Sequence, residues 1–210
     1  MTANHGTRPP TNGRAEPILG WRLWRLRGMR LESWAASYTW EPGENTARCL
    51  APLRRCLRAP GSGCRCGFWA LFSLLQCVER ACAERNERST VVGLIQGWGE
   101  VALHGSEGFR AAKASIACLL TDWPWDAPQT LADVGQGGRW RPRLRRALRH
   151  LSSPPPPEPW HARMLREAAA LYGVPLLSLE ESLRIGLLEE LGADEPMRSE
   201  VQAWVEMRIR

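Results

Sequence analysis

The sequence predicts an α+β fold, in which tryptophan-rich β-hairpins pack on a helix and a small, mainly helical C-terminal unit follows. Three observations support this prediction. Residues 21–40 are rich in aromatic side chains that favour strands, residues 91–120 alternate around a glycine-containing turn, and residues 68–85 repeat apolar side chains three or four positions apart. The first two patterns are typical of hairpins, and the third is typical of one face of a helix.

The chain begins with a segment that has no apolar period. Residues 1–17 are polar and punctuated by glycine and proline, so we expect a disordered arm there and a fold that starts near Ile18. Gly28 then interrupts residues 21–40, which predicts two or three short strands before a Glu-Pro-Gly turn at 41–43.

A helix and a second hairpin complete the predicted first domain. The apolar face of the helix, at residues 68–85, consists of Phe68, Leu71, Phe72, Leu75, Val78 and Cys82. The hairpin at residues 91–120 turns at residues 104–108, and its second strand covers residues 109–120. We expect both hairpins to pack on the helix.

Proline and glycine divide the rest of the chain. Both residue types dominate residues 123–138, which we interpret as a loop that leaves an α+β domain of residues 18–138 with the cysteine cluster. A basic helix at residues 139–151 and a proline-rich linker at residues 152–159 follow, and four successive prolines make that linker a semi-rigid spacer. Residues 160–210 are predicted to form the small helical unit.

The predicted C-terminal unit is too small to be stable alone, so we expect it to dock on the first domain or on a partner. Its helices are predicted at residues 161–172, 180–191 and 197–208. A short extended apolar run at residues 174–179 separates the first two. Ser178 and Glu181 have the spacing of a capping box, which indicates that the second helix begins slightly earlier.

The composition is that of a globular protein. Of the 210 residues, 44% are hydrophobic. The longest apolar run, at residues 68–78, is too short to span a bilayer, and the polar start lacks the apolar region of a signal peptide. We therefore expect a cytoplasmic protein with no membrane partner, in which the seven cysteines are reduced.

The charges are unevenly distributed between the two parts of the chain. Residues 1–157 carry 22 basic and 12 acidic side chains, whereas residues 158–210 carry 6 basic and 10 acidic ones. This asymmetry indicates either a polyanionic partner for the first part or an electrostatic contact between the two parts. Because Lys113 is the only lysine among 28 basic residues, the abundance of arginine is not by itself a functional signal.

The most informative motif is a cluster of four cysteines, Cys49, Cys56, Cys64 and Cys66. Zinc prefers four soft or borderline ligands in a tetrahedron, and a close Cys-x-Cys pair with two more distant cysteines can supply them. We therefore predict a structural zinc site. Four ligands leave no open coordination position, so this site would hold structure and would not activate water. The alternatives are ordinary buried or surface thiols and a redox role.

Glu100, His104 and Glu107 are weak candidates for catalysis. With Arg110 they form the only polar set that the predicted hairpin could bring together, and an acid/base pair is conceivable there. No nucleophile or phosphate-binding loop accompanies them. A single histidine beside a turn is more often a solvated or hydrogen-bonded structural residue.

The predicted basic helix is a candidate for contact with nucleic acid or another polyanion. The residues concerned are Arg139, Trp140, Arg141, Arg143, Arg145, Arg146 and Arg149. Arginines around an amphipathic helix beside a tryptophan suit phosphate contact and base stacking. Such a helix could equally bind an acidic protein, or its arginines could form a solvated face.

Two motifs lie within residues 21–120. One is Cys64-Arg65-Cys66-Gly67-Phe68-Trp69-Ala70, and the other is Gly99-Glu100-Val101-Ala102-Leu103-His104-Gly105 followed by Gly108-Phe109-Arg110-Ala111. These motifs resemble a family of uncharacterised actinobacterial proteins, which has a Cys-x-Cys-Gly-aromatic-Ala motif and a Gly-x-Val-x-Leu-x-Gly hairpin.

The resemblance implies a defined domain and one further metal ligand. In that family a histidine tends to stand between the first cysteine and the Cys-x-Cys pair, near the position of Cys56 or Leu57. If Cys56 takes the place of this histidine, the set of four ligands survives. If Leu57 does, the set is incomplete. The family has no activity that could be carried over to this chain.

These observations favour a non-enzymatic binding or adaptor protein of the cytoplasm, stabilised by a structural zinc. Its expected partner is another protein, which it would bind through its basic surface or its acidic C-terminal unit. The first alternative is a nucleic-acid-binding regulator that uses the helix at residues 139–149. The second is an enzyme built around His104 and Glu100.

Overall fold

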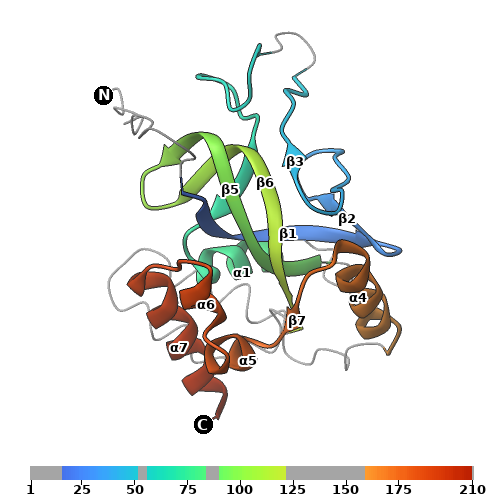
Figure 1. Ribbon diagram of the computed structural model, residues 1–210, viewed down its shortest axis with the longest axis vertical. Helices are drawn as coiled ribbons and strands as arrows, with labels where there is room; N and C mark the ends of the chain where they lie inside the picture. Colours follow the sequence, from blue (N-terminus) through green and yellow to red (C-terminus); the bar gives the residue numbers. More distant parts are fainter. Residues whose placement is uncertain (1–15, 52–55, 84–89, 122–158, 210) are drawn as a thin grey trace.

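The computed structural model describes residues 16–51, 56–83, 90–121 and 159–209 (Figure 1). It confirms the α+β class, with a mixed sheet of seven strands and several helices. The strands are β1 (Ile18–Arg27), β2 (Arg30–Ser33), β3 (Asn45–Thr46), β4 (Phe68–Leu71), β5 (Thr90–His104), β6 (Gly108–Leu120) and β7 (Leu176–Leu177). The helices are α1 (Leu74–Ala83), α4 (Pro159–Tyr172), α5 (Leu179–Arg184), α6 (Leu187–Glu190) and α7 (Glu195–Ile209). None of these helices is long and apolar enough to cross a membrane.

Both predicted hairpins are present. β1 and β2 pair antiparallel across a turn at Gly28, and β5 and β6 pair antiparallel across the turn that follows His104. The second hairpin is long, and its register shifts twice, once between Leu94 and Ile95 and once between Trp98 and Val101. Such irregularities increase the twist of a strand, so they help β5 to curve.

Strand pairing closes a ring of four strands. β5 pairs with β1 on one side and with β6 on the other, while β4 pairs with β6 along all four of its residues and with β1 only at Leu71. In Figure 1, β5 and β6 are seen to curve over β1. One face of the ring carries a tryptophan-rich core in which Trp24, Trp40 and Phe109 are fully buried. α4 packs on this core through Leu165.

The opposite face of the sheet is covered by α1 and by the C-terminal helices α5, α6 and α7. Its core includes Trp21 and Leu94 from the strands, with Leu188, Val201 and Trp204 from the C-terminal helices. β7, which was predicted as an extended run, adds to the sheet by pairing parallel with β6. The C-terminal segment therefore shares both hydrophobic cores with the sheet.

Two polar side chains, those of Tyr172 and Glu200, attach the C-terminal segment at defined points. The buried Tyr172 hydroxyl accepts a hydrogen bond from the Leu31 amide and donates one to the Trp40 carbonyl, at 2.9 and 2.8 Å. The Glu200 carboxylate of α7 accepts hydrogen bonds from the backbone amides of Leu74 and Leu75 at the start of α1. A carboxylate is favourable there because a helix N-terminus has unpaired amides and a partial positive charge.

The structure corrects two predicted helix boundaries. The helix predicted at residues 68–85 is a strand over Phe68–Leu71, and α1 begins only at Leu74. The reason is that pairing with β6 fixes the first four residues in an extended conformation. The helix predicted at residues 180–191 is divided into α5 and α6, because Gly186 adopts a left-handed conformation with φ of 68°.

Of the other predicted features, one is confirmed and the rest fall wholly or almost wholly outside the described residues. The capping box at the start of α5 is present, with hydrogen bonds in both directions between Ser178 and Glu181. The predicted disordered arm at residues 1–17 lies almost wholly outside the described residues. The basic helix at residues 139–151 and the prolines at residues 154–157 also lie outside them.

Candidate metal centre

The four cysteines of the predicted zinc site lie together at one end of the sheet. They belong to a segment between β3 and β4, residues 47–51 and 56–67, which we call the cysteine loop. Within it the Sγ atoms of Cys49, Cys56, Cys64 and Cys66 all lie within 4.8 Å of one another. All four side chains are partly exposed, and none of them forms a disulfide. The loop thus presents four sulfur atoms to a single point.

The distance between two of the sulfurs fits tetrahedral coordination. Zinc–sulfur bonds of about 2.3 Å place neighbouring sulfurs of a tetrahedron about 3.8 Å apart. The Sγ atoms of Cys49 and Cys64 are 3.7 Å apart. A disulfide would require about 2.05 Å. The cluster therefore has the donor atoms of a four-cysteine metal site, and this pair has the spacing that such a site requires.

The structure decides which residue occupies the second position of the cluster. The Sγ atom of Cys56 belongs to the group, whereas the Leu57 side chain is fully exposed. The set of four sulfur atoms is therefore complete, and the incomplete set that would follow from Leu57 does not apply.

Two glycines allow the cysteine loop to close around the sulfurs. A Cβ atom on Gly61 would lie 2.3 Å from the Cys56 Sγ atom, so any side chain there would displace that cysteine. The Gly61 amide also donates a hydrogen bond to the Cys66 Sγ atom at 3.2 Å. Gly67 follows the cluster with φ of 111°, a conformation that other residues rarely adopt. The backbone conformation therefore explains why a glycine follows the Cys-x-Cys pair.

The surroundings of the sulfurs separate their pKa values. Hydrogen bonds from the backbone amides of Cys56 and Ala51 favour the thiolate and lower the pKa of Cys49 to about 7. A hydrogen bond with the Cys64 side chain, followed by desolvation, raises the pKa of Cys56 to about 12. Cys49 is therefore better prepared than Cys56 to bind a cation near neutral pH, because metals bind the thiolate and displace its proton.

Arg110 of β6 joins the cysteine loop to the sheet. Its buried guanidinium donates hydrogen bonds to the backbone carbonyls of Cys64 and Cys66, the latter at 3.0 Å. Its Nε atom donates to the His104 Nε2 atom at 2.7 Å. The His104 ring in turn stacks on Trp69, with centroids 4.4 Å apart. One arginine therefore fixes the backbone of both cysteines of the Cys-x-Cys pair.

The structure also places the weak catalytic candidates. His104 is held between Arg110 and Trp69, and Glu107 pairs with Arg80 of α1. Glu100 is exposed at the second register shift of β5. Two of the three side chains thus have structural contacts. The predicted polyanion-binding residues 139–149 lie outside the described part of the chain, so their role stays a prediction.

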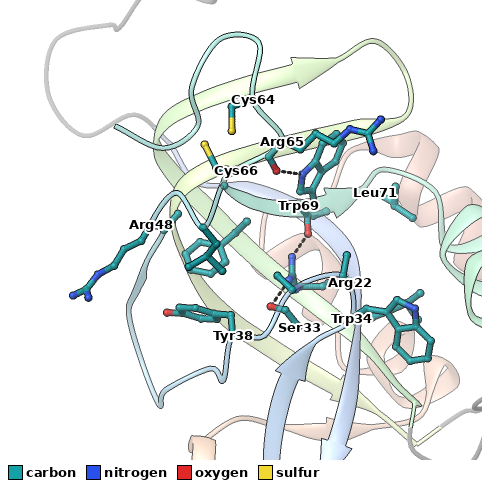
Figure 2. Close-up of a pocket in the computed structure, with 18 of the residues that line it drawn as sticks. Arg22, Ser33, Trp34, Tyr38, Arg48, Cys64, Arg65, Cys66, Trp69 and Leu71 are labelled. Atoms are coloured by element: carbon teal, nitrogen blue, oxygen red, sulfur yellow. Dashed lines mark hydrogen bonds between the residues drawn. The ribbon is translucent and has the colours of Figure 1, made fainter. Parts of the chain in front are cut away.

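A groove of about 950 Å³ runs beside the cysteine loop (Figure 2). The loop supplies one wall through Cys64, Arg65 and Cys66, and residues 33–36 with Tyr38 supply the other. The groove lies along the edge of β4 that faces away from β6, at the point where β4 and β1 are no longer paired. No local sequence signal indicates this groove, because Cys64–Cys66 and the residues of the facing wall come from separate segments of the chain.

Arg22 lies in the middle of the groove, between Trp69 and Ser33 (Figure 2). It donates hydrogen bonds to the Trp69 carbonyl and to the Ser33 Oγ atom, the latter at 2.9 Å. Its guanidinium also lies over the Trp40 ring, 4.8 Å from the centroid. Burial lowers the pKa of Arg22 to about 10, so the side chain stays charged at neutral pH. None of the ion pairs among the described residues involves Arg22.

Comparison with known proteins adds no functional information. The chain matches no protein-family model, no curated protein and no solved structure. The geometry of the cysteine cluster and of the groove therefore carries the functional argument.

Proposed function

We propose that this chain is a non-enzymatic binding protein, in which a structural zinc ion bound by Cys49, Cys56, Cys64 and Cys66 shapes one wall of a binding groove. The observation that carries the proposal is the position of the four sulfurs, all within 4.8 Å of one another and next to the groove. The proposed setting is a reducing compartment such as the cytoplasm, in which these thiols stay free to bind metal.

The chemistry of the donor set favours zinc and a structural role. Four thiolates in a tetrahedral arrangement suit zinc or iron, and both are held without an open position. Such a site stabilises the fold and leaves no place for a substrate or an activated water. The contacts of His104 with Arg110 and Trp69 also favour a structural role. His104 helps to position Arg110, which holds the cysteine loop. Binding, and not chemistry, is thus the activity that this arrangement supports best.

The position of the cluster relative to the groove links the metal to binding. Cys64 and Cys66 line the groove, and Arg65 between them lies at its margin. The Arg65 carbonyl accepts a hydrogen bond from the Trp69 Nε1 atom at 3.0 Å, which ties this wall to β4. A metal that orders the cysteine loop would therefore also set the width of the groove.

The test is the metal content of protein purified without added metal. We expect about one zinc per chain in the parent, as a closed four-cysteine site would hold, and loss of that zinc in Cys64→Ser. Cys118→Ala is the matched control, because Cys118 is a buried core residue outside the cluster and its loss should leave the zinc in place. A folded parent without metal would contradict the proposal. Absorbance bands of iron–thiolate bonds would show that the bound metal is iron and not zinc.

A further inference from the structure

We propose that the groove binds an extended acidic peptide segment of a partner protein, which adds a strand to the open side of β4 and places carboxylates near Arg22, Arg48 and Arg65. This inference rests on the proposed binding function and names the class of ligand. Three features of the groove support it: the free edge of β4, the unbalanced positive charge, and the small side chains of the walls.

The edge of β4 is open where it borders the groove. β6 pairs with all four residues of β4, but on the other side β1 pairs only with Leu71. The Trp69 carbonyl faces this open side, because Arg22 donates a hydrogen bond to it. In an antiparallel strand the amide and carbonyl of one residue point to the same side, so the Trp69 amide faces the groove as well. The Trp69 carbonyl is already bonded to Arg22, so the Trp69 amide is the edge group that an extended peptide would pair with.

The charges that line the groove are mainly positive. Among the described residues that line it are four arginines, Arg22, Arg48, Arg65 and Arg80, and one carboxylate, that of Glu107. Glu107 already forms an ion pair with Arg80. The other three arginines take part in none of the ion pairs found among the described residues. The groove thus has a surplus of positive charge that carboxylates of a ligand would balance.

Arg22 is the strongest part of this argument. Its Nε atom is buried and has no hydrogen-bond partner among the described residues. The contacts that it makes are to a carbonyl, a hydroxyl and aromatic rings, none of which carries a negative charge. A buried charge without a counterion is costly, so an anionic group that enters the groove gains from pairing with it.

The aromatic side chains favour a peptide over single-stranded nucleic acid. Nucleic acid would require free ring faces on which bases can stack. Trp34 already has the Arg25 guanidinium over its ring at 4.6 Å, and Trp69 is stacked on His104. Alanines at positions 35, 36, 47 and 51 line the groove instead. Small side chains let the backbone of an extended peptide approach closely and leave room for its alternate side chains.

Selection from random peptides displayed on phage tests the proposal without a prior choice of sequence. The parent protein is the bait, and the enriched peptides are then synthesised with a fluorescent label and titrated by anisotropy. We expect enrichment of extended sequences that contain Asp and Glu. A random single-stranded DNA pool, titrated in parallel, tests the nucleic-acid alternative.

Charge reversal at the groove margin identifies the site. Arg48 and Arg65 are exposed, so Arg48→Glu and Arg65→Glu should fold, and each should weaken binding of the enriched peptides about tenfold or more. Arg166→Glu is the matched control, because Arg166 is exposed on α4 and does not line the groove. It makes the same change of net charge and should alter the affinity less than about threefold.

The outcomes separate this inference from the proposed zinc site. Acidic peptides that lose affinity with Arg48→Glu and Arg65→Glu, but not with Arg166→Glu, support it. Peptides without acidic residues, equal loss in all three variants, no enrichment, or binding of the DNA pool instead of peptides would each overturn it. Zinc content is measured on every variant: a metal-loaded protein that binds no acidic peptide refutes the ligand and leaves the metal site standing.

A backbone measurement checks the added strand. Hydrogen exchange of the Trp69 amide should slow when the selected peptide is bound, since pairing with β4 would protect it. Binding with no change at Trp69 would show that the peptide lies elsewhere, and would overturn the proposed mode of binding.

Discussion

The cysteine loop and the C-terminal helices lie at opposite ends of the molecule, and they are attached to the same sheet by different means (Figure 1). The helices bury large apolar side chains, among which Leu188, Val201 and Trp204 are almost wholly inaccessible. The cysteine loop leaves Leu50 about half exposed and Leu57 fully exposed. Burial of a leucine stabilises the folded state by about 1.5–3 kcal/mol, and the exposed leucines of the loop contribute little of this stabilisation.

This difference indicates what each end needs in order to stay ordered. The helical end needs no bound ion, because buried apolar surface and a few hydrogen bonds such as that of Tyr172 stabilise it. The loop relies on convergent sulfurs and on the two carbonyls that Arg110 holds. If the proposed metal supplies the missing cohesion, one end of the molecule should respond to a chelator and the other should not.

Removal of the proposed metal is expected to have the largest effect, and to act at the loop alone. Structural zinc sites have apparent binding free energies of about 10–16 kcal/mol, which would be withdrawn from the loop. Hydrogen exchange before and after treatment with a chelator should show the Gly61 and Cys64 amides exchanging at least about a hundredfold faster. The Ser182 and Leu191 amides, which bond within the helical end, serve as the internal control. Equal acceleration at both ends would break the comparison.

A pair of leucines tests the same contrast from the side of burial. Leu188→Ala, in the core beneath the C-terminal helices, should lower the free energy of unfolding by about 2–5 kcal/mol through lost burial and a cavity. Leu57→Ala makes the same chemical change in the cysteine loop, where it should cost less than about 0.5 kcal/mol. Urea unfolding followed by circular dichroism measures both. Similar losses in the two variants would mean that the loop is also held by apolar contacts.

The parts of the structure that the sequence predicts are those that depend on local signals. Alternation and a turn predict the hairpin of β5 and β6, and the spacing of Ser178 and Glu181 predicts the cap of α5. Cysteine spacing predicts that the four cysteines cluster, although only the structure decides between Cys56 and Leu57.

The parts that the sequence does not predict depend on distant partners. Arg22 bonds a carbonyl 47 residues away, Arg110 one that is 44 residues away, and Glu200 caps a helix 126 residues before it. β4 is missed for the same reason, since its apolar residues fit a helical spacing and only pairing with β6 makes them a strand. The groove arises from these long-range contacts, so neither it nor its buried arginine has a local signal.

A change in the capping box at the start of α5 is expected to have the smallest effect on stability, and that effect should depend on pH. The Ser178 amide donates a hydrogen bond to the Glu181 carboxylate and lowers the pKa of Glu181 below its ordinary value. A lowered pKa contributes stability that is present above the unfolded-state value and is lost as pH falls through the folded-state value. Glu181→Gln should therefore lower the melting temperature on the order of 1 °C near pH 7 and leave it unchanged near pH 3.

The control for this prediction is Glu180→Gln, which removes a carboxylate one residue earlier in the same helical turn and outside the capping box. It should not reproduce the pH dependence of Glu181→Gln. Calorimetry across this pH range in the presence of a chelator keeps the cysteine loop out of the comparison, because acid also displaces metal from thiolates. A difference between the parent and Glu181→Gln that grows on acidification would have the wrong sign. Local capping could then no longer account for the start of α5, and its order would have to come from the apolar core around Leu179.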